Sequence, residues 1–152
     1  MENYADKAKR LFESGYNCAQ AVFCAFEDVT GMDQATAAKV ASSFGGGLGR
    51  MREVCGTVSG AAMVLGMVYG GYGPADQDSK VAHYHIVQDF CARFTAENGS
   101  IICRELLAGK TVKPGNDPEA RTPEYYKKRP CSELVWLSAK IVAEMLAERG
   151  NV

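Results

Sequence analysis

The fold is decided by residues 45–60, which read GGGLGRMREVCGTVSG. Glycines this close together permit positive φ and a close approach of the backbone, at an entropic cost that a simple linker would not need. The stretch leads through a short basic segment into Cys55, and no charged residue occurs between Glu53 and Asp76. An uncharged run of this length predicts a buried apolar helix at about 54–69, with Cys55 at its start.

The composition is that of an ordinary soluble protein. The 152 residues suffice for a single domain, 1–152, with a core of its own. Basic and acidic residues nearly cancel (17 − 18 = −1), so no overall field favours a nucleic acid or an anionic membrane as partner. Residues 1–7 lack the apolar segment of a signal peptide, and the glycines between 54 and 75 argue against a membrane span. These observations predict a cytoplasmic protein.

Apolar residues recur at helical spacing along most of the chain. The predicted helices cover about 4–13, 18–28, 34–44, 54–69, 76–98, 103–107 and 131–149. No segment shows the alternation of a β-strand, so the predicted fold is an all-α, single-domain helical bundle packed around the apolar helix at about 54–69. Gly56 and Gly60, four residues apart on that helix, predict a groove in which another helix lies close. Four of the five prolines fall at about 109–130, which predicts a long proline-rich loop of the kind that is usually functional.

Six cysteines are many for a cytosolic chain, and most of them recur in one kind of position. Four fall in the first turn or at the cap of a predicted helix: Cys18, Cys55, Cys103 and Cys131. The positive end of a helix and its unpaired amides stabilise a thiolate, which thiol exchange and metal ligation both require. Cys24 and Cys91 fall inside helices and are predicted to be inert core residues. No Cys-x-x-Cys pair occurs, so a shared site has to be assembled by the fold.

The order and spacing of the four cysteines resemble those of the C_GCAxxG_C_C family of redox-active proteins. The matching pieces are GYNCA at 15–19, the glycine run at 45–49, CGTVSGA at 55–61, CRELL at 103–107 and PC at 130–131. The resemblance spans about residues 8–146 and implies a redox role for these cysteines. One departure is plain, since Thr57 stands where the family motif Cys-Gly-Ala-x-x-Gly has alanine. A second, distant resemblance is to the non-haem part of split-Soret cytochromes, which implies an iron–sulfur option, although the haem motif is missing here.

The first functional hypothesis is a thiol-based oxidoreductase or electron carrier that cycles between dithiol and disulfide. Cys55 is the predicted nucleophile, because glycines give access to its sulfur and because Arg50 or Arg52 can lower its pKa. Cys103 and Cys131, joined by the proline-rich loop, are the pair predicted to form and break a disulfide, although four cysteines allow three connectivities. The expected partner is a redox protein or a small thiol, and so small a helical protein is compatible with a homodimer.

Two other classes of function stay open at this point. In one, the four cysteines are metal ligands and hold an iron–sulfur cluster or a tetrahedral zinc ion. His83 and His85 cannot chelate one ion together, because residues two apart on a helix lie about 200° around it, and either one alone is open as a single ligand. In the other class, the protein is a structural or interaction domain, and replacing Cys55 with serine costs stability but removes no activity or chromophore.

Overall fold

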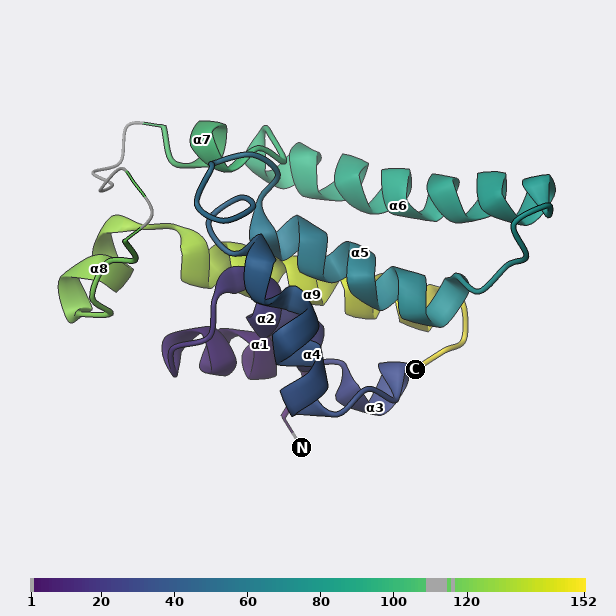
Figure 1. Cartoon of the computed structure of the whole chain (residues 1–152), viewed down its shortest axis with the longest axis horizontal. Helices are drawn as coiled ribbons and strands as arrows, with labels where there is room; N and C mark the ends of the chain where they lie inside the picture. Colours follow the sequence, from purple (N-terminus) through teal and green to yellow (C-terminus); the bar gives the residue numbers. More distant parts are fainter. Residues whose placement is uncertain (1, 109–114, 116) are drawn as a thin grey trace.

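The computed structural model describes residues 2–108, 115 and 117–152 (Figure 1). The described residues form helices and one isolated β-bridge, with no strand among them, so the prediction of an all-α, single-domain fold is confirmed. The helices are α1 (Tyr4–Glu13), α2 (Cys18–Cys24), α3 (Glu27–Thr30), α4 (Gln34–Ala41), the 3₁₀ turn η1 (Ser42–Phe44), α5 (Gly56–Tyr69), α6 (Gln77–Asn98), α7 (Cys103–Leu106), α8 (Pro123–Lys128) and α9 (Cys131–Glu148).

The core forms where α2, α5 and α9 pack against one another, with α1 lying on α9. Every residue from Ala21 to Phe26 is buried, so α2 is as central as the apolar helix α5. A side chain on Gly60 would place its Cβ 2.7 Å from the carbonyl oxygen of Ala19, a contact that real Cβ atoms do not make. The predicted groove at Gly56 and Gly60 is therefore confirmed, and α2 is the helix that lies in it.

The long helix α6 covers α5 and α9 from one side (Figure 1). It contributes Phe90 and Phe94 to the core, and their rings stack with centroids 6.0 Å apart. Its other face is open, since Val81 and Tyr84 are each about half exposed. No helix in the described part of the chain is long and apolar enough to cross a membrane.

Two predicted helices are shorter than expected. The chain turns at Ala25 and Phe26, so the segment predicted as one helix over 18–28 divides into α2 and α3. Both turn residues are buried, and the burial of the Phe26 ring, stacked at 4.4 Å on Tyr4, compensates for the break. The predicted helix over 34–44 is α-helical only to Ala41 and then tightens into η1 before the glycine run.

The segment predicted as a proline-rich loop at 109–130 lies partly outside the described residues, because 109–114 and 116 are not described. Its described part contains the short helix α8, which sequence analysis missed. The signal was present, since Thr122 accepts a hydrogen bond from the Tyr125 amide and Pro123 occupies the first helical position, where proline is favoured.

Candidate functional site

Each of the four singled-out cysteines stands at a helix start, as predicted. Cys18, Cys103 and Cys131 are the first residues of α2, α7 and α9, and Cys55 is the N-cap of α5. The start of α2 is held by a capping box, in which Asn17 and Gln20 exchange side-chain to backbone hydrogen bonds of 2.8 and 2.9 Å. Four separate helices thus deliver one cysteine each.

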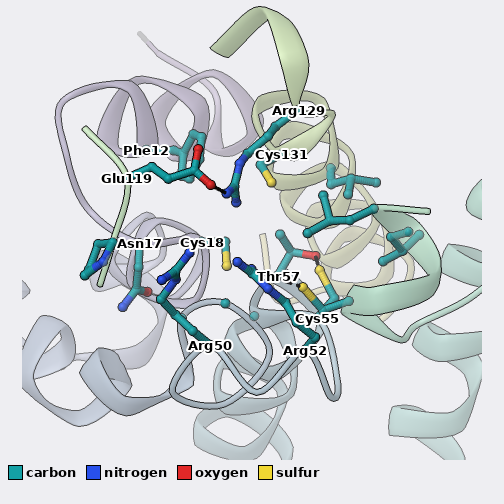
Figure 2. Close-up of a pocket in the computed structure, with 18 of the residues that line it drawn as sticks. Phe12, Asn17, Cys18, Arg50, Arg52, Cys55, Thr57, Glu119, Arg129 and Cys131 are labelled. Carbon is teal, nitrogen blue, oxygen red and sulfur yellow. Dashed lines mark hydrogen bonds and ion pairs between the residues drawn. The ribbon is translucent and has the colours of Figure 1, made fainter. Parts of the chain in front are cut away.

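The four thiols line a single cavity of about 270 Å³ (Figure 2). At ~30 Å³ for each water molecule, the cavity has room for about nine waters. Figure 2 shows the sulfurs of Cys18, Cys55 and Cys131 turned toward the space between them. All six cysteines of the chain are free thiols. The fold therefore gathers the four reduced cysteines that sequence reasoning selected, although they lie far apart in the chain.

An isolated antiparallel bridge explains why Cys55 and Cys103 face the same space. Val54 pairs with Ile102, the Cys55 amide donates to the Ile101 carbonyl at 2.8 Å, and the Cys103 amide donates to the Glu53 carbonyl at 2.6 Å. Side chains alternate between the two faces of an extended segment, so the two cysteines that flank the bridged pair share one face. Sequence analysis did not foresee this bridge, because one isolated pair leaves no alternating pattern.

The glycine run forms a left-handed turn around the cavity wall. Residues 46–50 all have φ between 55° and 73°, and Arg52 has φ 63°. The turn is closed by backbone hydrogen bonds from Arg50 to Gly45, Arg52 to Gly46 and Glu53 to Gly47, all between 2.9 and 3.1 Å. A residue other than glycine in this conformation costs about 1–2 kcal/mol. Leu48, Arg50 and Arg52 carry that strain.

Two glycines let the backbone approach the thiols. A Cβ on Gly56 would overlap the sulfur of Cys18, and a Cβ on Gly47 would lie 2.7 Å from the Cβ of Cys103. No other residue type fits at these positions without moving a cysteine. The glycine-rich stretch therefore does more than present Cys55 at a turn. Its glycines also let the backbone lie against Cys18 and Cys103.

The acidity of the thiols differs from the prediction. Burial raises the pKa of Cys55 and of Cys131 to about 12 in each case, and burial also raises the pKa of Cys18. Nearby donors favour the thiolates, namely the Gly46 amide beside Cys18, Thr57 beside Cys55 and Arg129 beside Cys131, but they do not outweigh burial. The expectation that Arg50 or Arg52 lowers the pKa of Cys55 is wrong, because burial is the largest cause of its shift.

The side chain of Thr57 lies directly against Cys55. Its hydroxyl is 3.1 Å from the Cys55 sulfur, and its carbonyl oxygen accepts a hydrogen bond of 2.8 Å from the buried hydroxyl of Ser138 on α9. Thr57 thus places a polar group at the thiol and is itself held by α9.

Arginines hold Gly115 and residues 117–130 against the cavity. Arg50 donates to the carbonyl oxygens of Gly115 and Asp117, and the buried guanidinium of Arg129 pairs with Glu119. Arg121 donates to the Phe12 and Tyr16 carbonyls at 3.0 Å each, and its guanidinium stacks 4.4 Å above the Phe12 ring. We call residues 117–130 the strap. Sequence analysis missed Arg121 and Glu119 and did not foresee this role for Arg50 and Arg129, because their partners are backbone groups or distant residues that only the fold brings close.

The spacing of possible metal ligands bears on the metal hypothesis. Within the part of the chain that the structure describes, no three His, Cys, Asp or Glu side chains are close enough to bind one metal ion. A tetrahedral zinc site needs three or four ligands around one ion, so this arrangement does not fit zinc. Four thiols spread around a common space fit an iron–sulfur cluster better, because the cysteine ligands are distributed over several irons and need not meet at one ion.

The remaining cysteines do not line the cavity. Cys24 is fully buried on α2, and its thiol lies 3.6 Å from the carbonyl oxygen of Gln34. Cys91 is half-buried on α6. Burial raises the pKa of both thiols, that of Cys24 to about 11. Their placement agrees with the prediction that they are core residues.

Comparison with known families assigns the chain. Residues 16–145 match the family model C_GCAxxG_C_C, described as "Putative redox-active protein". The chain belongs to this family. The matched residues contain all four cavity cysteines, the glycine run and the strap. Comparison with curated proteins and with solved structures gave no match, so the resemblance to split-Soret cytochromes has no support there.

Proposed function

We propose that this member of the C_GCAxxG_C_C family is a thiol redox protein whose cavity stores an electron pair in its cysteines. The observation that carries the proposal is the gathering of Cys18, Cys55, Cys103 and Cys131, all free, around one cavity. In the oxidative step, two cavity thiols lose two protons and two electrons and form one S–S bond. The electron pair reduces a disulfide of a partner protein or of a small molecule to two thiols.

Cys18 and Cys55 are the first pair to test. In support, the sulfur of Cys18 packs against Gly56, the residue that follows Cys55, and after burial Cys18 is the largest cause that raises the pKa of Cys55. The pair Cys103 and Cys131, predicted from the sequence, is the competing assignment. Disulfide mapping by mass spectrometry separates the two.

Because the buried thiols are neutral, the reduced protein is protected from thiol–disulfide exchange. A thiol with a pKa of about 12 has very little thiolate at neutral pH, and only the thiolate attacks a disulfide. Exchange therefore requires the cavity to open, and the strap is the segment that covers it. This makes residues 117–130 the expected point of contact for a redox partner.

The test is a thiol count on the denatured protein before and after mild oxidation. The reduced chain has six thiols, and one disulfide leaves four. Reversible loss of two thiols supports the proposal, provided that it disappears in Cys18→Ser or Cys55→Ser and persists in the matched control Cys91→Ser. A count that stays at six under oxidants that convert ordinary dithiols overturns it.

A second candidate is an electron carrier that holds an iron–sulfur cluster on the same four cysteines. It is favoured by four thiols, delivered by four separate helices, around a shared cavity. Such a cluster would supply one-electron chemistry, and its positive irons would hold the cysteines as thiolates. An absorption spectrum of protein purified without oxygen, with iron and sulfide analysis, tests it. Visible bands that bleach on reduction, lost in each of the four serine variants, would place this candidate first.

A further inference from the structure

Two arginines of the cavity wall have buried nitrogens with no hydrogen-bond partner. These are Nη2 of Arg52 and Nε of Arg129, among the residues that the structure describes. One other nitrogen of each guanidinium is engaged, since Nη1 of Arg52 lies 3.8 Å from the Cys103 sulfur and Nη2 of Arg129 pairs with Glu119. Arg129 as a whole is only 9% exposed. A buried donor left without an acceptor is costly, so these two nitrogens call for a ligand.

The two donors face the same space. Both residues line the four-cysteine cavity, and Figure 2 shows their guanidinium groups reaching into it from opposite sides. The charged side chains among the described lining residues are four arginines, at 50, 52, 121 and 129, and Glu119. The cavity wall is therefore strongly positive in a chain whose net charge is only −1.

The backbone is strained to place one of these groups. Arg52 has φ 63°, a left-handed conformation that non-glycine residues adopt at a cost. Strain of this kind is typically kept where a side chain has to be positioned for function. At Arg52, this strained conformation directs a long cationic side chain into the cavity and away from solvent.

We propose that the cavity holds a binding site for a small oxyanion, between Arg52 and Arg129 and beside the four thiols. An oxyanion supplies several acceptor oxygens in one compact group, which matches N–H donors that converge from two guanidinium forks. Its negative charge offsets the excess of arginine in the wall. The site does not depend on what the thiols do, so it is testable in protein whose thiol chemistry has been removed.

The direct test follows the Nε–H signals of the arginines by NMR while sodium sulfate replaces sodium chloride at constant ionic strength. We expect saturable shifts at Arg52 and Arg129, and no shift at Arg149, whose guanidinium lies on Tyr69 at the far end of α9. Inorganic phosphate is the second probe. Absence of a saturable shift at Arg129 with either anion overturns the proposal and indicates that water alone satisfies these donors.

Variants give the second test. Arg52→Gln removes one fork and should weaken sulfate binding at least tenfold, whereas Glu119→Gln removes the competing carboxylate and should tighten it severalfold. Arg149→Gln is the matched control and should leave the affinity unchanged. Cys55→Ser should also keep binding, which separates failure of this site from failure of the thiol proposal. Equal affinity in the wild type, Arg52→Gln and Glu119→Gln would place the anion elsewhere and contradict the inference.

Discussion

The hydroxyl of Thr57, the second residue of α5, lies 3.1 Å from the sulfur of Cys55, the N-cap of that helix. This contact places a polar group against a buried thiol. A hydroxyl can donate to a thiolate, so Thr57 partly offsets the burial that raises the pKa of Cys55. Thr57 therefore keeps the pKa of Cys55 lower than burial alone would make it.

Replacing Thr57 with alanine removes this donor. We expect the pKa of Cys55 to rise further, and its alkylation at a fixed alkaline pH to slow by about tenfold, since a hydrogen bond to a charged group contributes roughly 1.5–3 kcal/mol. Peptide mapping of iodoacetamide-labelled protein measures the rate at Cys55 alone. Ser59→Ala, a neighbouring loss of a hydroxyl, is the control. Unchanged labelling of Cys55 in Thr57→Ala would show that the contact does not act on the thiolate.

The raised thiol pKa values predict a specific dependence on pH. An unperturbed thiol titrates near pH 9 and Cys55 near pH 12, so the folded chain binds more protons than the unfolded chain between these values. The free energy of unfolding should therefore be constant below about pH 9 and fall as the pH rises from 9 to 12. Urea unfolding across this range, compared between wild type and Cys55→Ser, measures the effect. A smaller fall in the variant is expected, and identical curves would contradict the assigned pKa.

The same shift predicts slow chemistry at Cys55 and Cys131. Three pH units correspond to about a thousandfold less thiolate at pH 8 than in an unperturbed thiol. In native protein, both thiols should be alkylated at least a hundredfold more slowly than the same cysteines in urea-unfolded chain. Quantitative mass spectrometry over time provides both rates in one experiment. Labelling of native Cys55 at the unfolded rate would mean that the cavity is open in solution.

Two glycines of α5 offer a matched pair for stability. Gly56→Ala would drive a Cβ into the Cys18 sulfur and to 2.9 Å from the Phe44 carbonyl, so it should destabilise the protein by about 1–3 kcal/mol. Gly66 has no atom within 4 Å of its Cβ position, and Gly66→Ala should stabilise the helix by roughly 0.5–1 kcal/mol. Urea unfolding of both variants checks the prediction. Equal effects would mean that Cys18 moves away at little cost.

The sequence was sufficient for most of the helices and for the place of the four cysteines at helix starts, because each rests on a local signal. Apolar spacing marked α5 and α6, and Asn17 marked the helix start that carries Cys18. The rest depends on contacts that have no local pattern. The bridge between Val54 and Ile102 joins segments about fifty residues apart, and it alone places Cys55 and Cys103 on one face.

The acidity of the thiols could not be read from the sequence for a related reason. Basic neighbours in the chain suggested a lowered pKa for Cys55, whereas the pKa depends on how deeply the fold buries the sulfur. Arg50 illustrates the difference. It precedes Cys55 by five residues, yet its guanidinium donates to the carbonyl oxygens of Gly115 and Asp117. Proximity in sequence therefore did not identify its partner.

Arg121 attaches the strap to the segment at the end of α1. Its guanidinium donates hydrogen bonds to two backbone carbonyls at and just after the end of α1, those of Phe12 and Tyr16. It also lies 5.0 Å from the ring centroid of Tyr125. Arg121→Gln removes the fork and the stacking, so we expect a loss of about 1–3 kcal/mol and severalfold faster alkylation of Cys131. Arg10→Gln, which breaks an exposed pair with Glu2, should change neither quantity by a comparable amount. Faster alkylation of Cys131 without a matching change at Cys91 would show that the strap controls access to the cavity, whereas equal acceleration at both would indicate general loosening of the fold.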